Sequence, residues 1–243
     1  EMRKKYKLPF DWIERLGIKT FNCLVALTEF QKNKAVGMNP GLDIRVIPNG
    51  VDSQVFSLAR SVEGSRNLLY FGRIDIHTKG LDILLESIAK VTEISDDIDL
   101  VIGGKGTHSD EERFVKMAES FDLSKRVFLK GYEKYDLLKS SLIFLATSRF
   151  ENFGGAILEA MASGCPVVIF DLPCHSWIPS DCVVRVAPFD VDGYACAVRH
   201  LIDYPEEREA MGRKARSFVR AFSWDNTAKK YEEFIEDVTN RNA

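Results

Sequence analysis

Short apolar runs alternate with segments of helical spacing from residue 68 to residue 222, and this alternation limits the fold more than any other feature. The apolar runs, which we predict to be strands, are 68–71, 100–102, 127–129, 142–146, 167–170 and 182–186. The first predicted helix has apolar residues at helical spacing, at 81, 84, 85 and 88. Further helices are predicted at 110–121, 133–140, 190–204 and 206–222. Strands that are apolar throughout are typical of a parallel sheet covered on both faces. The sequence therefore predicts an α/β fold with a doubly wound, Rossmann-like parallel sheet, whose ligands bind beyond the carboxyl ends of the strands.

A shorter α/β segment precedes this alternation. Predicted strands at 24–27 and 45–47 flank a helix for which Thr28 is the expected N-cap. Pro48-Asn49-Gly50 is a strong turn signal, and the stretch 51–67, which has little periodicity, is interpreted as a linker. We place the start of the main domain near Val46.

Composition excludes several classes of function. The net charge of −3 gives no reason to expect a nucleic-acid partner, and no apolar run approaches the length of a membrane span. Five scattered cysteines with no CxxC spacing indicate reduced thiols in a cytoplasmic protein, and there is no secretory signal pattern. Because the chain opens at Glu1, we expect it to be a piece of something longer. The basic segment 1–22 is interpreted as a helix from a neighbouring domain, with peripheral contact at the inner face of the cell membrane as the alternative.

The stretch 149–164 carries two carboxylates and a glycine pair between two predicted strands. Gly154 and Gly155 allow close backbone approach at a helix start, where free N–H groups favour an anionic or hydroxyl-rich ligand. Glu151 lies in the preceding turn and Glu159 lies two helical turns later, so that together they frame a polar ligand. The alternative is that Glu151 is a solvated loop charge and Glu159 a favourable charge near a helix start.

A cation pair follows the predicted strand 68–71. Arg73 can direct two N–H donors at phosphate oxygens, and Lys79 can supply a mobile point charge to the same group. The alternative makes Arg73 a surface charge and Lys79 a lysine at a helix start, a position that the helix dipole disfavours. A ligand with negative charge explains the pair better.

Two further segments fall at the same predicted edge of the sheet. Gly131 and Tyr132 follow the strand 127–129, where a flat base can rest on the ring; core packing of Tyr132 is the favoured alternative. Gly103-Gly104-Lys105-Gly106 has neither the spacing of a dinucleotide fingerprint nor that of a Walker loop, so that it is weak evidence for a phosphate site.

Five short motifs in chain order carry a specific resemblance. They are Ile47-Pro48-Asn49-Gly50-Val51-Asp52, Gly72-Arg73 with Lys79-Gly80-Leu81-Asp82, Gly131, Glu151-Asn152-Phe153-Gly154, and Leu158-Glu159-Ala160-Met161-Ala162. With these motifs, residues 22–239 resemble the C-terminal, donor-binding domain of a GT-B glycosyltransferase of family 4, the retaining group of glycogen-synthase-like and mannosyltransferase-like enzymes. The resemblance implies that 1–46 is the end of the N-terminal acceptor domain, 47–222 the nucleotide-sugar donor-binding domain and 223–243 a C-terminal crossing helix. The chain would then be one lobe of a GT-B fold plus a remnant of the other.

The resemblance also implies roles for individual residues. Arg73 and Lys79 would hold the donor diphosphate and stabilise the charge on the leaving group. Glu151 would contact the donor sugar near its anomeric face, without being assigned as a nucleophile, and Glu159 would accept hydrogen bonds from the ribose. The remaining donor-binding positions would be Gly131, Tyr132, Asn152, Phe153, Gly154 and Gly155. We expect no metal and no cofactor, because His108 and His200 lack partners at metal-ligand spacing.

The chain departs from the family at two places. Asn152 stands where the family usually has glycine, so that its amide either reaches the sugar or only lines the loop. After the fifth strand the family often has a glycine pair and Pro-Glu, and the segment 172–179 stands in their place here. This difference leaves the choice of donor sugar open. His175 and Trp177 are candidates for contacts peculiar to this branch; the favoured alternative has Trp177 plugging the sheet edge and His175 exposed.

The function expected from the resemblance is retaining transfer of a sugar from a nucleotide-diphosphate sugar to an acceptor hydroxyl. The acceptor, whether glycan, lipid or small molecule, would bind through the missing N-terminal domain. We therefore expect this chain alone to bind nucleotide and to transfer sugar poorly or not at all. The alternatives are a nucleotide-sugar epimerase on the same fold and a non-catalytic module that binds nucleotide sugars.

Overall fold

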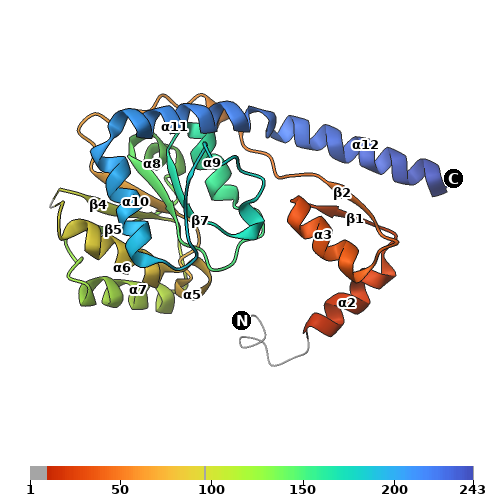
Figure 1. The fold of residues 1–243 in the computed structure, drawn as a ribbon, viewed down its shortest axis with the longest axis horizontal. Coiled ribbons are helices and arrows are strands. Elements are labelled where there is room, and N and C mark those ends of the chain that lie inside the picture. Colours follow the sequence, from red (N-terminus) through yellow and green to blue (C-terminus); the bar gives the residue numbers. More distant parts are fainter. Residues whose placement is uncertain (1–9, 96, 243) are drawn as a thin grey trace.

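The computed structural model describes residues 10–95 and 97–242, and its centre is a six-stranded parallel sheet (Figure 1). Its strands are β3 (Asn67–Phe71), β4 (Asp99–Gly103), β5 (Val127–Lys130), β6 (Ile143–Ala146), β7 (Val167–Phe170) and β8 (Val184–Val186). Their order across the sheet is β5-β4-β3-β6-β7-β8, and every pairing is parallel. The chain therefore winds in one direction from β3 to β5 and in the other from β6 to β8, which creates a switch point between β3 and β6.

Helices cover both faces of this sheet because successive strand residues point to opposite sides. On one face, residues such as Leu68, Leu100 and Ile143 pack with α6 (Leu81–Thr92), α7 (His108–Ser120) and α10 (Val191–Asp203). On the other face, residues such as Leu69 and Phe144 pack with α8 (Lys134–Ser140), α9 (Gly155–Ser163) and part of α11 (Pro205–Phe218). The predicted doubly wound α/β fold is confirmed.

Most element boundaries lie within two residues of the predicted ones, and the exceptions have physical reasons. The helix predicted to reach 222 ends at Phe218 and continues as the 3₁₀ turn η2 (Val219–Ala221). The segment interpreted as a linker contains α4 (Ser53–Phe56), and Val51 and Val55 within it are fully buried against α9 and its neighbours.

A second, smaller body lies beside the main sheet (Figure 1). It consists of α2 (Phe10–Thr20), β1 (Cys23–Ala26), α3 (Glu29–Met38) and β2 (Asp43–Val46), with β1 and β2 paired in parallel. Thr28 caps α3 as predicted, because its side chain accepts a hydrogen bond from the backbone N–H of Gln31.

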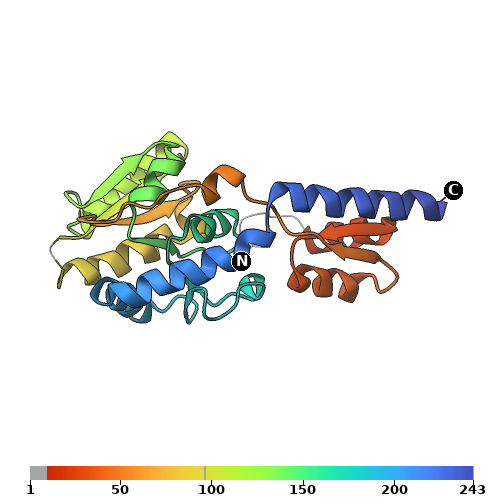
Figure 2. The ribbon, with the colours of Figure 1, turned by 90° about the horizontal axis from the view of Figure 1, so that it is seen from above.

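The C-terminal helix α12 (Trp224–Asn242) runs from the main domain over this smaller body (Figure 2). Asp237 forms an ion pair with Arg45 at 2.6 Å, and Arg241 forms one with Asp43 at 2.7 Å. On α12, Phe234 is buried with the Arg45 guanidinium over its ring, while Trp224, Tyr231 and Ile235 remain exposed.

Within the described residues, no helix has the length and apolar character needed to cross a membrane. The basic residues 3–7 and the side chain of Trp12, which carry the alternative of membrane contact, lie outside the part that the structure describes.

Candidate active site

A pocket of about 310 Å³ opens at the switch point between β3 and β6. Its wall is formed by residues that follow β3, residues that follow β6 and the first turn of α9. Five of the predicted site residues meet in it: Arg73, Lys79, Glu151, Gly154 and Gly155. The carboxyl ends of parallel strands share one edge of a sheet, and this explains why residues so far apart in sequence come together.

Lys79 and Glu151 form the central contact of this pocket. The ammonium group of Lys79 donates to Glu151 Oε2 at 2.7 Å, and both side chains are about four-fifths buried. Ser148, which belongs to none of the sequence motifs, also reaches Glu151 Oε2, with its hydroxyl 3.4 Å away. The pair therefore has a fixed geometry in which Lys79 still has two N–H donors for another acceptor.

A second ion pair ties the loop after β6 to the helix start that follows Lys79. Arg149 donates two parallel hydrogen bonds to Asp82, each 2.7 Å long, and the hydroxyl of Thr147 donates to the carbonyl of Lys79. Although burial alone would raise the pKa of the Asp82 carboxyl, the hydrogen bonds and charge of Arg149 bring it below its ordinary value.

Gly80 permits this close approach of the two loops. It has a φ of +63°, and a Cβ added there would lie 2.1 Å from the carbonyl oxygen of Thr147. Only glycine fits this position without strain.

Arg73 is the most accessible cation of the pocket. Its side chain is 67% exposed, and its guanidinium lies 3.5 Å from Asp75, the residue whose side chain caps α5 (Ile76–Lys79). The backbone carbonyl of Arg73 accepts a hydrogen bond from the hydroxyl of Tyr70 at 2.7 Å, so that the backbone is anchored while the guanidinium can reach a ligand.

The start of α9 supplies a third source of positive potential. Gly154 is the N-cap, has a φ of +88°, and makes no side-chain cap hydrogen bond. The N–H groups of the first turn, beginning at Gly155, therefore lack a side-chain acceptor at the cap and lie at the pocket wall. Two cations and a helix start thus surround one cavity, which can accept a diphosphate.

Glu159 lies outside this cavity, one helical turn beyond Gly155. Its carboxylate accepts a hydrogen bond from Lys134 at 2.9 Å, at the start of α8. The Lys134 ammonium also lies 5.1 Å from the ring of Tyr135, whose hydroxyl donates to Asp52. Lys134 was missed at the sequence level, although a lysine at a helix start, which the helix dipole disfavours, was an available signal.

Tyr132 lies at the same edge of the sheet, after β5. Its ring is 67% exposed, so that the core packing favoured from the sequence is wrong. The ring lines a second hollow, of about 510 Å³, which shares Gly72 and Arg73 with the first pocket, and Lys105 Nζ lies 6.0 Å from the ring centre. Gly131 precedes it, and a Cβ added there would meet nothing within 4 Å. The ring is free because β5 is the edge strand and no further strand covers it among the described residues.

The other predicted residues of the 149–155 loop serve its packing. Phe153 is 2% exposed and its ring stacks on Trp177 with centroids 4.6 Å apart, while the Trp177 indole N–H donates to the Phe153 carbonyl. The Asn152 carbonyl accepts a hydrogen bond from Gln31 of α3, at 3.2 Å. Trp177 therefore supports the loop, whereas Asn152 links it to the smaller body.

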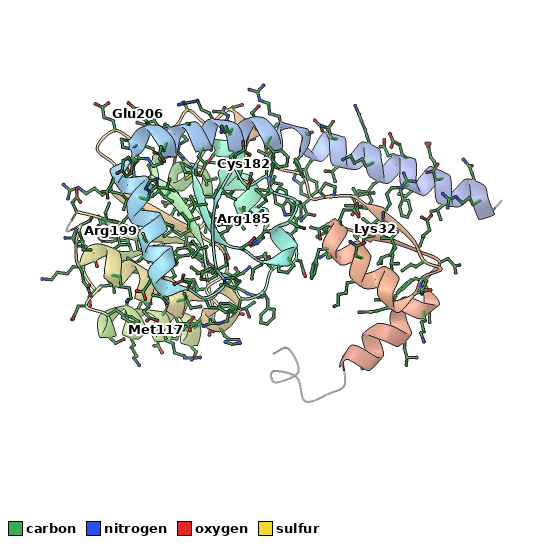
Figure 3. The ribbon with its side chains drawn as sticks, viewed as in Figure 1. Lys32, Met117, Cys182, Arg185, Arg199 and Glu206 are labelled. Atoms are coloured by element: carbon green, nitrogen blue, oxygen red, sulfur yellow. The ribbon has the colours of Figure 1, made fainter. Side chains whose placement is uncertain are left out.

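The expectation that His175 is exposed is wrong. His175 lies in the short helix η1 (Pro173–His175), is 1% exposed, and has Nδ1 3.0 Å from the carbonyl of Phe170. Arg185, labelled in Figure 3, holds this segment inward, because its guanidinium donates to the carbonyls of His175 and Ile178. Burial lowers the pKa of the His175 imidazole, which favours its neutral form.

No cluster of three or more histidine, cysteine or acidic side chains that could hold a metal ion occurs among the described residues. The positive charge at the pocket comes from Arg73 and Lys79.

Comparisons with known proteins agree on one family. The model of a family described as glycosyl transferases group 1 matches residues 57–218. The chain is 29% identical over 210 residues to a phosphatidyl-myo-inositol mannosyltransferase of Mycolicibacterium smegmatis, covering 82% of this chain and 53% of that protein. It is 30% identical over 228 residues to a glycogen synthase of Mycobacterium tuberculosis, covering 90% of this chain and 54% of that protein.

Among solved structures, a mutant of TarM from S. aureus in complex with UDP and other ligands has the same fold. The TM-score is 0.79 at 23% identity, and the match covers 89% of this chain and 44% of TarM. The chain spans about half the length of the curated relatives it matches.

Proposed function

The chain belongs to the glycosyl transferases group 1 family, and on that premise we propose that its pocket holds the diphosphate of a nucleotide sugar. The sugar is then transferred to an acceptor hydroxyl with retention of configuration. The observation that carries this proposal is the meeting of Arg73, Lys79 and the first turn of α9 in one cavity at the switch point of the sheet. The UDP in the TarM complex supports the choice of ligand class.

Each element of the pocket has a different task in this proposal. Lys79 keeps one hydrogen bond to Glu151 and directs its other donors at the phosphate oxygens. Arg73 binds the diphosphate with its planar fork of donors, and the N–H groups of α9 add their partial charge. As the bond to the sugar breaks, negative charge grows on the leaving diphosphate, and these groups stabilise it without rearrangement.

Glu151 binds the donor sugar rather than attacking it. Its carboxylate is already engaged by Lys79 and Ser148, and each of these contacts weakens it as a nucleophile. Its other oxygen accepts a hydrogen bond from the backbone N–H of Asn152 at 3.3 Å and has a second lone pair for a hydroxyl of the bound sugar. In this scheme the leaving phosphate receives the proton of the acceptor hydroxyl, which attacks from the same face.

The nucleoside binds at the carboxyl edge of the sheet, on the side of β5. The exposed Tyr132 ring, beside a hollow that shares Arg73 with the diphosphate pocket, offers a stacking surface for the base. Glu159 accepts hydrogen bonds from the ribose hydroxyls and is held for this role by Lys134. The acceptor binds to a domain outside this chain, so that the chain alone binds nucleotide and transfers little or no sugar.

Calorimetric titration with UDP, GDP and ADP tests the proposal. We expect selective binding of one diphosphate, and its loss in Arg73→Ala and in Lys79→Ala. Arg113→Ala is the matched control, because Arg113 is an exposed arginine on α7 and does not line the pocket. Failure of all three diphosphates to bind would contradict the proposed ligand, and equal binding by Arg73→Ala and the control would contradict the proposed site. Sugar transfer by the purified chain would contradict the expected need for another domain.

A further inference from the structure

A second polar cavity, of about 270 Å³, lies at the opposite, amino-terminal edge of the sheet. It is enclosed by α11, by the turn that joins α9 to β7, and by the segment that precedes β3; α11 runs along the top of the molecule in Figure 1. Among the described residues, Glu209 is its one acidic lining residue. The cavity is also lined by four arginines, Arg60, Arg208, Arg213 and Arg216. None of the four lines the diphosphate pocket.

Three of these arginines make hydrogen bonds to backbone carbonyls. Arg60 donates to the carbonyls of Leu138 and Ser141, and Arg208 donates to that of Leu201 at 3.1 Å. Arg216 donates to the carbonyl of Phe56. Within the described part of the chain, no carboxylate forms an ion pair with any of the three, so that their charges are fixed in place but not neutralised.

Arg208 is the most informative of the four. It is only 8% exposed, and it lies in the first turn of α11, where the helix dipole disfavours a cation. Burial lowers the pKa of its guanidinium, the charge of the adjacent Glu209 acts in the opposite direction, and the nearby Arg60 charge lowers the pKa further. A buried charge without an ionic partner is costly, and an anion in the cavity would remove that cost.

The acidic groups around the cavity offset this charge only in part. Glu209 lies 3.8 Å from Arg213, at the limit of an ion pair, and both side chains are more than half exposed. An adjoining hollow that shares Arg60 and Arg208 contains Glu63 and Asp97, but within the described ranges neither is within 4.0 Å of an arginine of the cavity.

The cavity is built on a close backbone approach. Gly164 has a φ of +79°, and a Cβ added to Gly212 of α11 would lie 2.2 Å from its carbonyl oxygen. The two glycines bring α11 against the turn after α9, which places the stems of Arg60 and Arg216 beside Gly164. Arg60 and Arg216 are therefore held beside this turn, whereas Arg213 reaches the cavity from the exposed side of α11.

We propose that this arginine pocket binds a compact dianion, either inorganic phosphate or the phosphoryl group of a small phosphomonoester. A phosphate oxyanion matches the planar donor fork of arginine, and each guanidinium has five N–H donors, of which the carbonyls use only some. The cavity is large enough for a phosphoryl group with a small organic substituent. The site is separate from the diphosphate pocket, so that its occupancy does not depend on the nucleotide.

Titration of Arg73→Ala protein with inorganic phosphate and with glucose 6-phosphate tests this proposal at low ionic strength, because that background weakens the other anion site. We expect saturable binding of at least one probe, with the tighter one identifying the source of the phosphoryl group. Adding Arg213→Gln should weaken binding about tenfold, the lower end of a charge-assisted hydrogen bond. Adding Glu209→Gln should strengthen binding by about threefold, because it removes a nearby negative charge.

The matched control is Arg113→Gln on α7, which changes the net charge as much as Arg213→Gln does but lies across the molecule (Figure 1). Arg213 and Glu209 are exposed, so that these variants are expected to fold, and thermal melts verify this. No saturable binding of either probe would overturn the proposal. Equal affinities in Arg213→Gln, Glu209→Gln and the control would also overturn it. Nucleotide binding by the protein without the Arg73 substitution is a separate measurement that does not share these outcomes.

Discussion

Two lysine–glutamate pairs lie at the carboxyl edge of the sheet, and they differ in their surroundings rather than in their own geometry. Lys79 and Glu151 are 2.7 Å apart, and Lys134 and Glu159 are 2.9 Å apart. All four side chains are between 20% and 26% exposed. Distance and burial alone therefore do not distinguish the pair proposed to bind a diphosphate from the pair proposed to bind hydroxyl groups.

The neighbours of the two pairs make the distinction. Around Lys79 there are a second cation, Arg73, and the uncapped first turn of α9, so that the pair faces a positive cavity. Around Lys134 there is a second carboxylate, Asp52, linked through the Tyr135 hydroxyl. The pKa of Asp52 is lowered, first by the hydrogen bond from the backbone N–H of Gln54 and then by the hydrogen bond from the Tyr135 hydroxyl. We infer that the first pair attracts an anion and that the second offers acceptors to hydroxyl groups.

Replacing the lysine of each pair with methionine should give the largest difference. Lys79→Met should weaken binding of the nucleoside diphosphate about 100-fold, the upper range for a charge-assisted hydrogen bond to phosphate. Lys134→Met, the matched control, removes the same group from the other pair and should weaken binding by less than about tenfold, because it only loosens Glu159. Calorimetric titration measures both. Equal losses in the two variants would show that the pairs do not have different roles.

Alanine substitutions at Gly80 and Gly131 should have different effects on the stability of the folded chain. Gly80→Ala forces a side chain into the left-handed region and against the carbonyl of Thr147, so that we expect a loss of about 2 kcal/mol. That loss corresponds to a melting temperature lower by about 4–8 °C. Gly131→Ala is the control, because nothing lies within 4 Å of the added Cβ, and it should change stability by less than about 0.5 kcal/mol. Chemical denaturation of both variants measures this; similar losses would contradict the close packing at Gly80.

The fold and the meeting of residues in the switch-point pocket follow largely from the sequence. A fully buried parallel strand needs a run of apolar residues, so that strands such as β7 are predicted at their observed bounds. Parallel strands end at one edge, and this rule alone brings Arg73, Lys79 and Glu151 to the same side of the sheet. The resemblance to the family is confirmed by the match over residues 57–218.

The features that the sequence did not disclose depend on contacts between distant side chains. The partner of Glu159 is Lys134, and this pairing depends on how α8 lies against α9, which no local pattern specifies. The interpretation favoured from the sequence leaves His175 exposed. It is buried because Arg185, ten residues later, donates to its carbonyl and draws the loop inward.

A comparison of ribose and deoxyribose nucleotides tests whether Glu159 contacts the ribose. Glu159→Gln should weaken binding of the preferred nucleoside diphosphate by about tenfold, because a charged acceptor is replaced by a neutral one. With the 2′-deoxynucleoside diphosphate, the wild-type chain should already bind more weakly and the substitution should have a smaller further effect. Non-additivity between the two changes would show that Glu159 contacts the ribose. Glu133→Gln, at the neighbouring helix start, is the control and should leave both affinities unchanged.

The smallest expected effect concerns the Arg149–Asp82 clamp, which supports the first pair. Since the pKa of Asp82 is lowered in the folded chain, its ionised form adds stability above its unfolded value of about 4, and this stability is lost as the pH falls through the lower folded value. Asp82 is 37% exposed, so that solvent screening limits the contribution to about 0.5–1 kcal/mol. Asp82→Asn should therefore lower the melting temperature by about 2 °C at pH 7, with the difference from wild type shrinking below about pH 4. Asp136→Asn, in the first turn of α8, is the control because it removes one carboxylate away from the clamp. A constant difference between Asp82→Asn and wild type down to about pH 3 would mean that the clamp acts through shape rather than charge.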